Sequence, residues 1–164
     1  MEVIGDGVWI VRKDATLVGQ RIPERTGFFD SLPITEAQYK GWRDRQSWLY
    51  TTRNDYGEFD LHVEYWLRVR CNSGISIRDR SRAKYAIVSP VDFTKTPSKI
   101  GYEIQIANLY PDPTGSIYTF VDTKTGPQVD NEWNALDIES RDRMIRVRFN
   151  GTLVGEHPIR AIER

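Results

Sequence analysis

The sequence predicts an all-β fold built from antiparallel strands, and two observations support that prediction. Apolar and polar side chains alternate with a period of two, and no long stretch shows the 3.6-residue period of an amphipathic helix. Strand-like segments recur roughly every 8–14 residues between turns, a spacing that favours a two-layer sandwich. The length of 164 residues suggests a single domain, residues 1–164, around one core.

The N-terminal part combines short strands with a long polar segment. Residues 8–20 predict two strands joined by a turn near residues 13–14. Residues 21–46 are polar and irregular, and we expect a long loop there with a short helix near residues 35–40. A loop of that length within a compact domain is often functional.

The central part predicts three further strands. Residues 47–69 have strand character, with a turn at Tyr56 and Gly57, and residues 72–80 form the next strand. Residues 80–99 predict a second long loop, because they begin with basic residues and contain two prolines. Residues 100–110 are the third strand, and the segment "PDPTG" that follows predicts a turn.

The C-terminal part predicts three strands and one hairpin. Residues 132–140 and 144–149 are strand-like, and residues 152–157 form the returning strand. Asn150 and Gly151 stand between the last two strands, and Asn-Gly suits the positive φ angles of a type I′ turn.

Three of the predicted strands carry functional groups on one face. Because side chains alternate across a strand, each strand can be divided into an apolar and a polar face. The polar faces carry Asp60, His62, Glu64, Trp66 and Arg68 in one strand, Asn72, Gly74, Ser76 and Arg78 in the second, and Glu103 and Gln105 in the third. If these strands are neighbours in a sheet, Glu64, Arg78, Glu103 and Gln105 converge on one surface near Trp66.

An ordinary solvent-exposed sheet face also explains such alternation, and for any one of these residues it is the alternative to a functional role. The composition of this face favours a site. A glycine such as Gly74 within a strand often marks the close approach of a ligand or another backbone. Trp66 beside carboxylates and amides suits a sugar, whose apolar face stacks on the ring while polar groups bond its hydroxyls.

Composition argues against several other classes of protein. The chain has 23 basic and 23 acidic residues, so net charge does not favour nucleic acid or anionic membranes, and the basic segment 78–84 is best explained as a solvated loop. A single Cys, two His and no calcium-loop spacing lead us to expect no metal and no other cofactor. No apolar run approaches a membrane span, and the N-terminus lacks the features of a signal peptide.

Six motifs occur in the order in which the 3-keto-disaccharide hydrolase domain family has them. They are "YGEFDLHVEYWL", "NSGISIR", "GYEIQI", "TGSIY", "EWNALDI" and "VRFNGTLV". The chain resembles this family from about Gly7 to Val154, least well in residues 21–46. The resemblance implies a concanavalin A-like jelly-roll sandwich of two antiparallel sheets, whose concave face holds carbohydrate. It also implies a bacterial protein of the periplasm or the exterior, whereas the residues themselves leave the localisation open.

The chain departs from the family pattern in three places. It lacks strands resembling the usual first and last strands of the family, and Ala107 and Asn108 stand where an acidic residue usually follows the "EIQI" strand. A sandwich without two strands has an exposed sheet edge, and exposed edges promote association. We therefore expect either a homodimer through that edge or an edge covered by residues 21–46.

The resemblance implies cleavage of glycosides already oxidised to a ketone at C3. The ketone acidifies the C2 hydrogen, so that a base can remove it and expel the C1 substituent, after which water can add. Glu103 or Glu64 would be the base, and Arg78 would bind the enolate oxygen. The expected sugar-binding groups are Gln105, Asn72, Trp66 and Tyr118, with His62 either a sugar contact, an alternative base or a plain surface residue.

Two other functions remain open on the residues alone. Glu64 and Glu103 could be the carboxylate pair of an ordinary glycosidase, an expectation that depends on fold analogy. The same face could also belong to a lectin-like module that binds sugar without cleaving it. All three functions predict a carbohydrate ligand, and none involves nucleic acid or a membrane.

Overall fold

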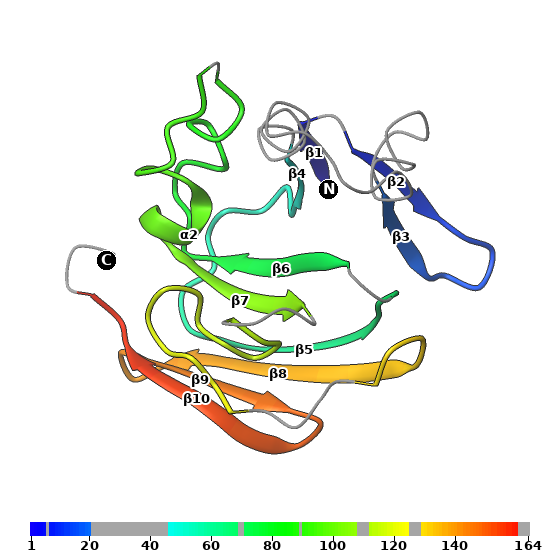
Figure 1. The fold of residues 1–164 in the computed structure, drawn as a ribbon. Coiled ribbons are helices and arrows are strands. Elements are labelled where there is room, and N and C mark those ends of the chain that lie inside the picture. Colours follow the sequence, from blue (N-terminus) through cyan, green and yellow to red (C-terminus); the bar gives the residue numbers. More distant parts are fainter. Residues whose placement is uncertain are drawn as a thin grey trace, which may run out of the picture. The chain divides into compact units, whose positions relative to one another are not determined.

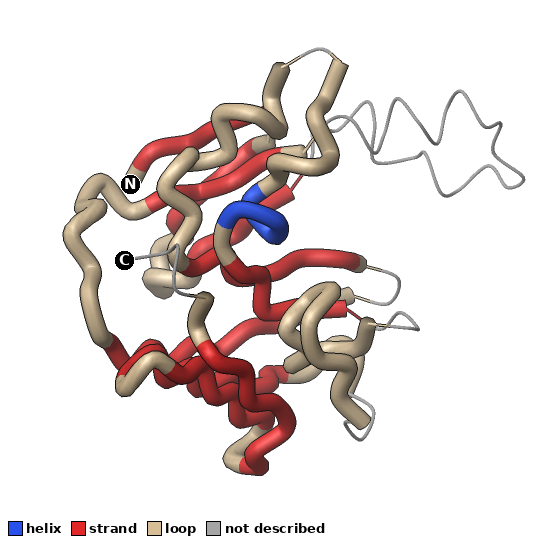
Figure 2. Tube along the Cα trace, turned by 90° about the vertical axis from the view of Figure 1, so that its left-hand side faces the viewer, coloured by secondary structure: helices blue, strands red, loops and turns tan. Residues whose placement is uncertain are grey.

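Strands and loops make up nearly all of the computed structural model, as the tube in Figure 2 shows. The structure describes residues 1–5, 7–20, 46–68, 71–88, 90–107, 112–124 and 129–160. The predicted all-β fold is confirmed, because each of the strand pairs is antiparallel. The loop predicted at residues 21–46, with its helix, lies outside the described residues except for Gln46. Among the described helices, none has the length and apolar character needed to cross a membrane.

The chain divides into two compact units, of which the first comprises Met1–Asn54 and Ser81–Thr96. In this unit β1 (Glu2–Gly5) pairs with β4 (Ser47–Tyr50), and β2 (Val8–Val11) pairs with β3 (Leu17–Gln20). The β2–β3 hairpin confirms the turn predicted near residues 13–14. The organisation of residues 1–164 as a single domain stays a prediction.

The second unit comprises Asp55–Arg80 and Pro97–Arg164, and it contains two packed sheets. One sheet has the strand order β10-β9-β8-β5, and the other pairs β6 with β7. The strands are β5 (Phe59–Trp66), β6 (Asn72–Ile77), β7 (Tyr102–Ala107), β8 (Trp133–Arg141), β9 (Met144–Phe149) and β10 (Thr152–Pro158). Figure 1 shows β6 and β7 on one side of this unit and the four-stranded sheet on the other.

The core of the second unit lies between these two sheets. Each sheet contributes its apolar alternate positions, which are fully or almost fully buried. The core residues are Tyr65, Ile77, Tyr102, Ile104, Ile106, Ile117, Leu136, Ile138, Ile145, Val147 and Phe149. Fully burying one such side chain stabilises a fold by about 1.5–3 kcal/mol, so this layer is the main source of stability. The apolar faces predicted for the strands at 59–69, 72–78 and 102–106 are therefore confirmed where the structure describes them.

Two local features test the turn and helix predictions. Asn150 and Gly151 have φ angles of 47° and 82°, which confirms the hairpin turn between β9 and β10. The expectation that helix occurs only near residues 35–40 is wrong, because α2 (Pro97–Ile100) forms one turn before β7. Proline with its fixed φ is favoured at the first position of a helix, so Pro97 begins a turn that a strand pattern does not reveal.

The four-stranded sheet has two outer strands, β10 and β5. Each has one strand partner among the described residues, β9 for β10 and β8 for β5. A homodimer through a sheet edge stays a prediction.

Candidate active site

The face of the β6–β7 sheet that points away from the core carries three of the residues predicted for the site, Asn72, Glu103 and Gln105. The register pairs Ser76 with Glu103, Gly74 with Gln105, and Asn72 with Ala107. These residues alternate with Ile104 and Ile106, which are buried in the core. Glu103, Gln105 and Asn72 therefore share one surface, as the sequence predicted.

A third segment extends this sheet along the free edge of β7. The backbone N–H of Tyr118 donates to the Glu103 carbonyl at 2.9 Å, and the N–H of Gln105 donates to the Ser116 carbonyl at 2.9 Å. These two bonds flank the bridge between Ile104 and Ile117, whose side chains are both buried. Tyr118 is therefore opposite Glu103 on the polar face, and its role as a sugar-binding group stays a prediction.

Gly74 lets the Glu103 side chain lie across the neighbouring strand. A Cβ atom added at Gly74 would lie 2.5 Å from Oε1 of Glu103 and 2.9 Å from its Cγ. Such distances are below van der Waals contact, so any larger residue would force the Glu103 side chain to move. The glycine in this strand thus marks a close approach, which comes from Glu103.

Glu103 is a carboxyl group in an environment that disfavours its charge. Burial and, to a smaller extent, the negative charge of Asp112 together raise the pKa of Glu103 from 4.5 to about 7. A carboxyl group with this pKa exchanges its proton near neutral pH, which is the property required of a general base or acid. Raised pKa values of this origin are frequent at functional sites.

Asp112 and Asp122 are two acidic groups that the sequence interpretation missed. Burial raises the pKa of Asp112, and so does a hydrogen bond with the side chain of Asp122. The motif "DPTG" predicts a turn at Asp112, but a turn motif does not show that the chain returns here to the edge of β7.

No group of three His, Cys, Asp or Glu side chains within the described ranges is arranged to hold a metal ion.

Arg78 does not lie on the polar face, and the expectation that it does is wrong. Its φ of 58° ends the alternation of β6, so the side chain no longer follows the pattern of Asn72, Gly74 and Ser76. The guanidinium donates from Nε to Oγ of Ser140 at 3.0 Å and from an Nη nitrogen to the Gly57 carbonyl at 3.3 Å. Ser140 is a fully buried residue of β8. Arg78 thus connects the end of β6 to the four-stranded sheet, and we assign it a structural role.

Glu64 and Trp66 also lie on a different surface from Glu103, although the sequence predicted one shared surface. Glu64, His62 and Trp66 belong to β5, which pairs with β8 and has no pairing with β6 or β7. Because the core lies between the two sheets, the polar face of β5 and the polar face of β7 point in opposite directions. The prediction of a single cleft near Trp66, lined by Glu64, Arg78, Glu103 and Gln105, is therefore wrong.

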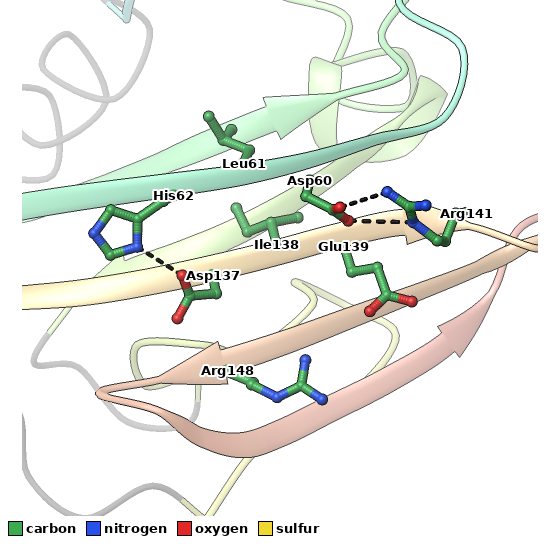
Figure 3. A pocket seen from close by; sticks show the side chains of 8 residues that line it. All are labelled: Asp60, Leu61, His62, Asp137, Ile138, Glu139, Arg141 and Arg148. Atoms are coloured by element: carbon green, nitrogen blue, oxygen red, sulfur yellow. Dashed lines mark hydrogen bonds and ion pairs between the residues drawn. The ribbon is translucent and has the colours of Figure 1, made fainter.

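The outer face of the four-stranded sheet has its own polar arrangement, which Figure 3 shows. Nδ1 of His62 lies 2.6 Å from Oδ1 of Asp137, and this hydrogen bond raises the pKa of His62. Asp60 pairs with Arg141 on the same face (Figure 3). A hollow of about 430 Å³ is lined by Asp60, Leu61, His62, Asp137, Ile138, Glu139, Arg141 and Arg148. His62, Asp60 and Asp137 in this lining are exposed and already paired, so the hollow is a weaker candidate for catalysis than the surroundings of Glu103.

Replacing Arg78 with alanine is expected to destabilise the fold by about 1–3 kcal/mol, because a charged hydrogen bond to the buried Ser140 hydroxyl is lost. Urea unfolding would measure this change. Arg80→Ala is the matched control, since Arg80 is exposed, and it should unfold like the wild-type protein. An Arg78→Ala protein with normal stability and severely reduced turnover would instead restore Arg78 to the catalytic site.

One comparison with known proteins, the family match, agrees with the motifs. The family described as 3-keto-alpha-glucoside-1,2-lyase-like domain matches residues 12–163. A search of curated proteins finds no match. Among solved structures, a candidate glycosyl hydrolase from Parabacteroides distasonis is similar with a TM-score of 0.49 and 24% identity, over 63% of this chain and 52% of that chain. The chain thus spans about half the length of that protein.

Proposed function

Because the chain belongs to the 3-keto-alpha-glucoside-1,2-lyase-like domain family, we propose that it cleaves glycosides carrying a ketone at C3, with Glu103 as the base. Membership of this family supports an activity on carbohydrates. The single observation that supports the finer proposal is the environment of Glu103. It is a carboxyl group with a pKa of about 7 on the polar face of β7, beside Tyr118 and Gly74.

The ketone determines which groups the reaction needs. Removal of the C2 proton leaves an enolate whose negative charge is delocalised onto the C3 oxygen. As the enolate collapses, a C1–C2 double bond forms, the bond from C1 to the leaving oxygen breaks, and that oxygen takes up a proton. Water adding across the new double bond would complete a net hydrolysis. The protein must supply one base and donors for the two oxygen atoms that gain charge.

Glu103 suits the role of base because its pKa lies near the working pH. A carboxylate in water is a weak base toward a carbon acid, whereas one whose pKa is about 7 takes up the proton more readily. Asp112 contributes through its negative charge, which raises the pKa of Glu103. We therefore propose Asp112 as a positioning residue that adjusts the basicity of Glu103.

The other polar groups on this face differ in how well they can bind the substrate. The Tyr118 hydroxyl is the donor that we propose for an oxygen of the substrate, since Tyr118 is opposite Glu103 across the sheet edge. Asn72 is exposed and can bond sugar hydroxyls directly. Gln105 is only 5% exposed, which leaves little of its amide for a sugar and favours a role in holding the face in shape.

The glycosidase alternative is not supported by this arrangement. Ordinary glycosidases need their two carboxyl groups within about 5–9.5 Å of each other on one side of the sugar. Glu64 and Glu103 lie on outward faces of two different sheets with the core between them. A lectin-like function remains as the second candidate, because binding needs no base.

Incubation with a 3-keto-glycoside and with its unoxidised parent tests the proposal. Cleavage of the keto form alone, with the unsaturated or hydrated sugar as product, is the expected result. Cleavage of both compounds would contradict it, since an unoxidised sugar has no acidic C2 hydrogen. Binding of the keto form without any cleavage would instead support the lectin-like function.

Gly74→Ala is expected to slow cleavage by roughly tenfold or more, because misplacing a catalytic group by about 1 Å can cost up to 10²-fold. The added Cβ would meet Oε1 of Glu103 at 2.5 Å and displace it. Gly57→Ala is the matched control, since nothing lies within 4 Å of a Cβ at Gly57. Steady-state kinetics together with thermal melting separates a displaced base from a damaged fold, and equal rates for both variants would contradict the role of this contact.

A further inference from the structure

The outer face of the four-stranded sheet presents two tryptophans side by side. Trp66 of β5 and Trp133 of β8 are directly paired in the register, so their side chains project from the same face. Their exposed fractions are 43% and 60%. No other tryptophan of the described residues is exposed. Exposed apolar patches that polar residues surround often mark binding sites, so the pair is a candidate for one.

The positions that follow the two tryptophans along β5 and β8 on this face carry polar side chains, except for one alanine. One step along the sheet Glu64 is opposite Ala135, and one step further His62 is opposite Asp137. Alternate residues of a strand are about 6.6–6.8 Å apart, so these groups follow the tryptophans at regular distances. Ala135 has no side chain beyond Cβ, which leaves room beside Glu64 between the indole rings and the His62–Asp137 pair.

The chemistry of this strip fits a sugar better than a protein. The central part of a protein interface is depleted of charged residues, whereas here Glu64, His62 and Asp137 adjoin the aromatic pair directly. An indole ring stacks on the apolar face of a pyranose, while carboxylate and imidazole groups bond its hydroxyls. The side chains of Glu64, His62 and Asp137 are 71%, 57% and 44% exposed, so they are accessible to such hydroxyls.

From this arrangement we infer that Trp66 and Trp133, with Glu64, His62 and Asp137, form an accessory binding surface for a neutral oligosaccharide. Two adjacent rings suit two consecutive sugar units, and the polar pairs extend the surface toward further units. The carboxylates of Glu64 and Asp137 disfavour acidic sugars. This surface points away from Glu103 on the other side of the core, so it holds a chain without contributing to cleavage.

The test is intrinsic tryptophan fluorescence and calorimetry with neutral hexasaccharides of glucose, xylose and mannose as probes. Wild-type protein should bind at least one of them, and Trp66→Ala and Trp133→Ala should each weaken that binding at least tenfold. Leu153→Ala is the matched control, because Leu153 is a similarly exposed apolar residue of β10, 46% exposed, and it should bind normally. Trp66→Phe keeps a ring and should retain part of the affinity, and circular dichroism verifies that each variant is folded.

The outcomes separate this inference from the proposed function. Both tryptophan variants should cleave a small 3-keto-glycoside at the wild-type rate, and Glu103→Gln should bind the hexasaccharide normally. Failure of the wild-type protein to bind any of the three probes would overturn the inference, as would unchanged affinity in both tryptophan variants. Sedimentation showing a wild-type dimer that both variants dissociate would assign the pair to a protein interface instead.

Discussion

Glu103→Gln is expected to lower kcat for cleavage of a 3-keto-glycoside by about 10²- to 10⁴-fold, the usual contribution of a general base. Glutamine has nearly the same shape as glutamate and cannot accept the C2 proton. Steady-state kinetics with the keto substrate measures the loss. For the wild-type protein, kcat/KM should rise with pH up to about 7 and then level off, because the base must be deprotonated and burial raises the pKa of Glu103 to about 7.

Glu64→Gln is the matched control for this variant. Glu64 is a carboxylate on the outer face of β5, so its replacement should leave the rate unchanged. Deuterium at C2 of the substrate should give a primary isotope effect in the wild-type protein, since the C2–H bond breaks in the proposed step. Full activity of Glu103→Gln, or cleavage without an isotope effect in a single turnover, would contradict C2 proton removal by Glu103.

The same substitution is expected to stabilise the fold at alkaline pH. Below pH 4.5 the Glu103 carboxyl group is protonated in both the folded and the unfolded chain, so it has no effect on the balance between them. Between pH 4.5 and about 7 the unfolded chain releases this proton while the folded chain retains it, and stability falls as pH rises. Above that range the folded chain holds a buried charge, at a cost on the order of 3 kcal/mol for a pKa raised from 4.5 to about 7.

Urea unfolding of the wild-type and Glu103→Gln proteins at pH 4 and pH 8.5 measures this effect. The variant should be more stable at pH 8.5, by on the order of 3 kcal/mol, and about equal at pH 4. Glu64→Gln should show no such gain. A Glu103→Gln protein that is less stable than the wild type at pH 8.5 would mean that the carboxylate is stabilised in the folded state, which is contrary to its raised pKa. A gain in stability combined with a loss of activity is the pattern expected of a catalytic residue in a strained environment.

The predicted strand faces agree with the structure because alternation is a local property of the backbone. In β7 the sequence separates Ile104 and Ile106 from Glu103 and Gln105, and both isoleucines belong to the hydrophobic core between the sheets. In β5 the same rule places Tyr65 in the core and Glu64 and Trp66 outside. Turn chemistry is equally local, and Asn150-Gly151 adopts the positive φ angles that it predicts.

The candidate site was only partly predictable from the sequence, and each wrong prediction about it has an identifiable physical cause. Arg78 has a strand-like neighbourhood, yet its φ of 58° redirects the side chain to Ser140, which is 62 residues away in the sequence. Asp112 acts on Glu103 because a loop returns to the β7 edge, and a turn motif carries no information about where its side chains end. Long-range contacts of this kind depend on the folded chain and leave no periodic signal.

The sequence by itself determined the all-β fold, the two faces of each strand and the family, because each depends on neighbouring residues or on ordered motifs. The tertiary structure alone decided which polar faces meet. Strand β5 pairs with β8, so its apolar face covers the apolar face of β6 and β7, and burying both faces in one core turns their polar faces apart. Alternation is set within a strand, whereas sheet partners are chosen by the burial of apolar surface across the whole unit. For that reason Glu103 and Trp66, which the sequence placed on one surface, lie on two.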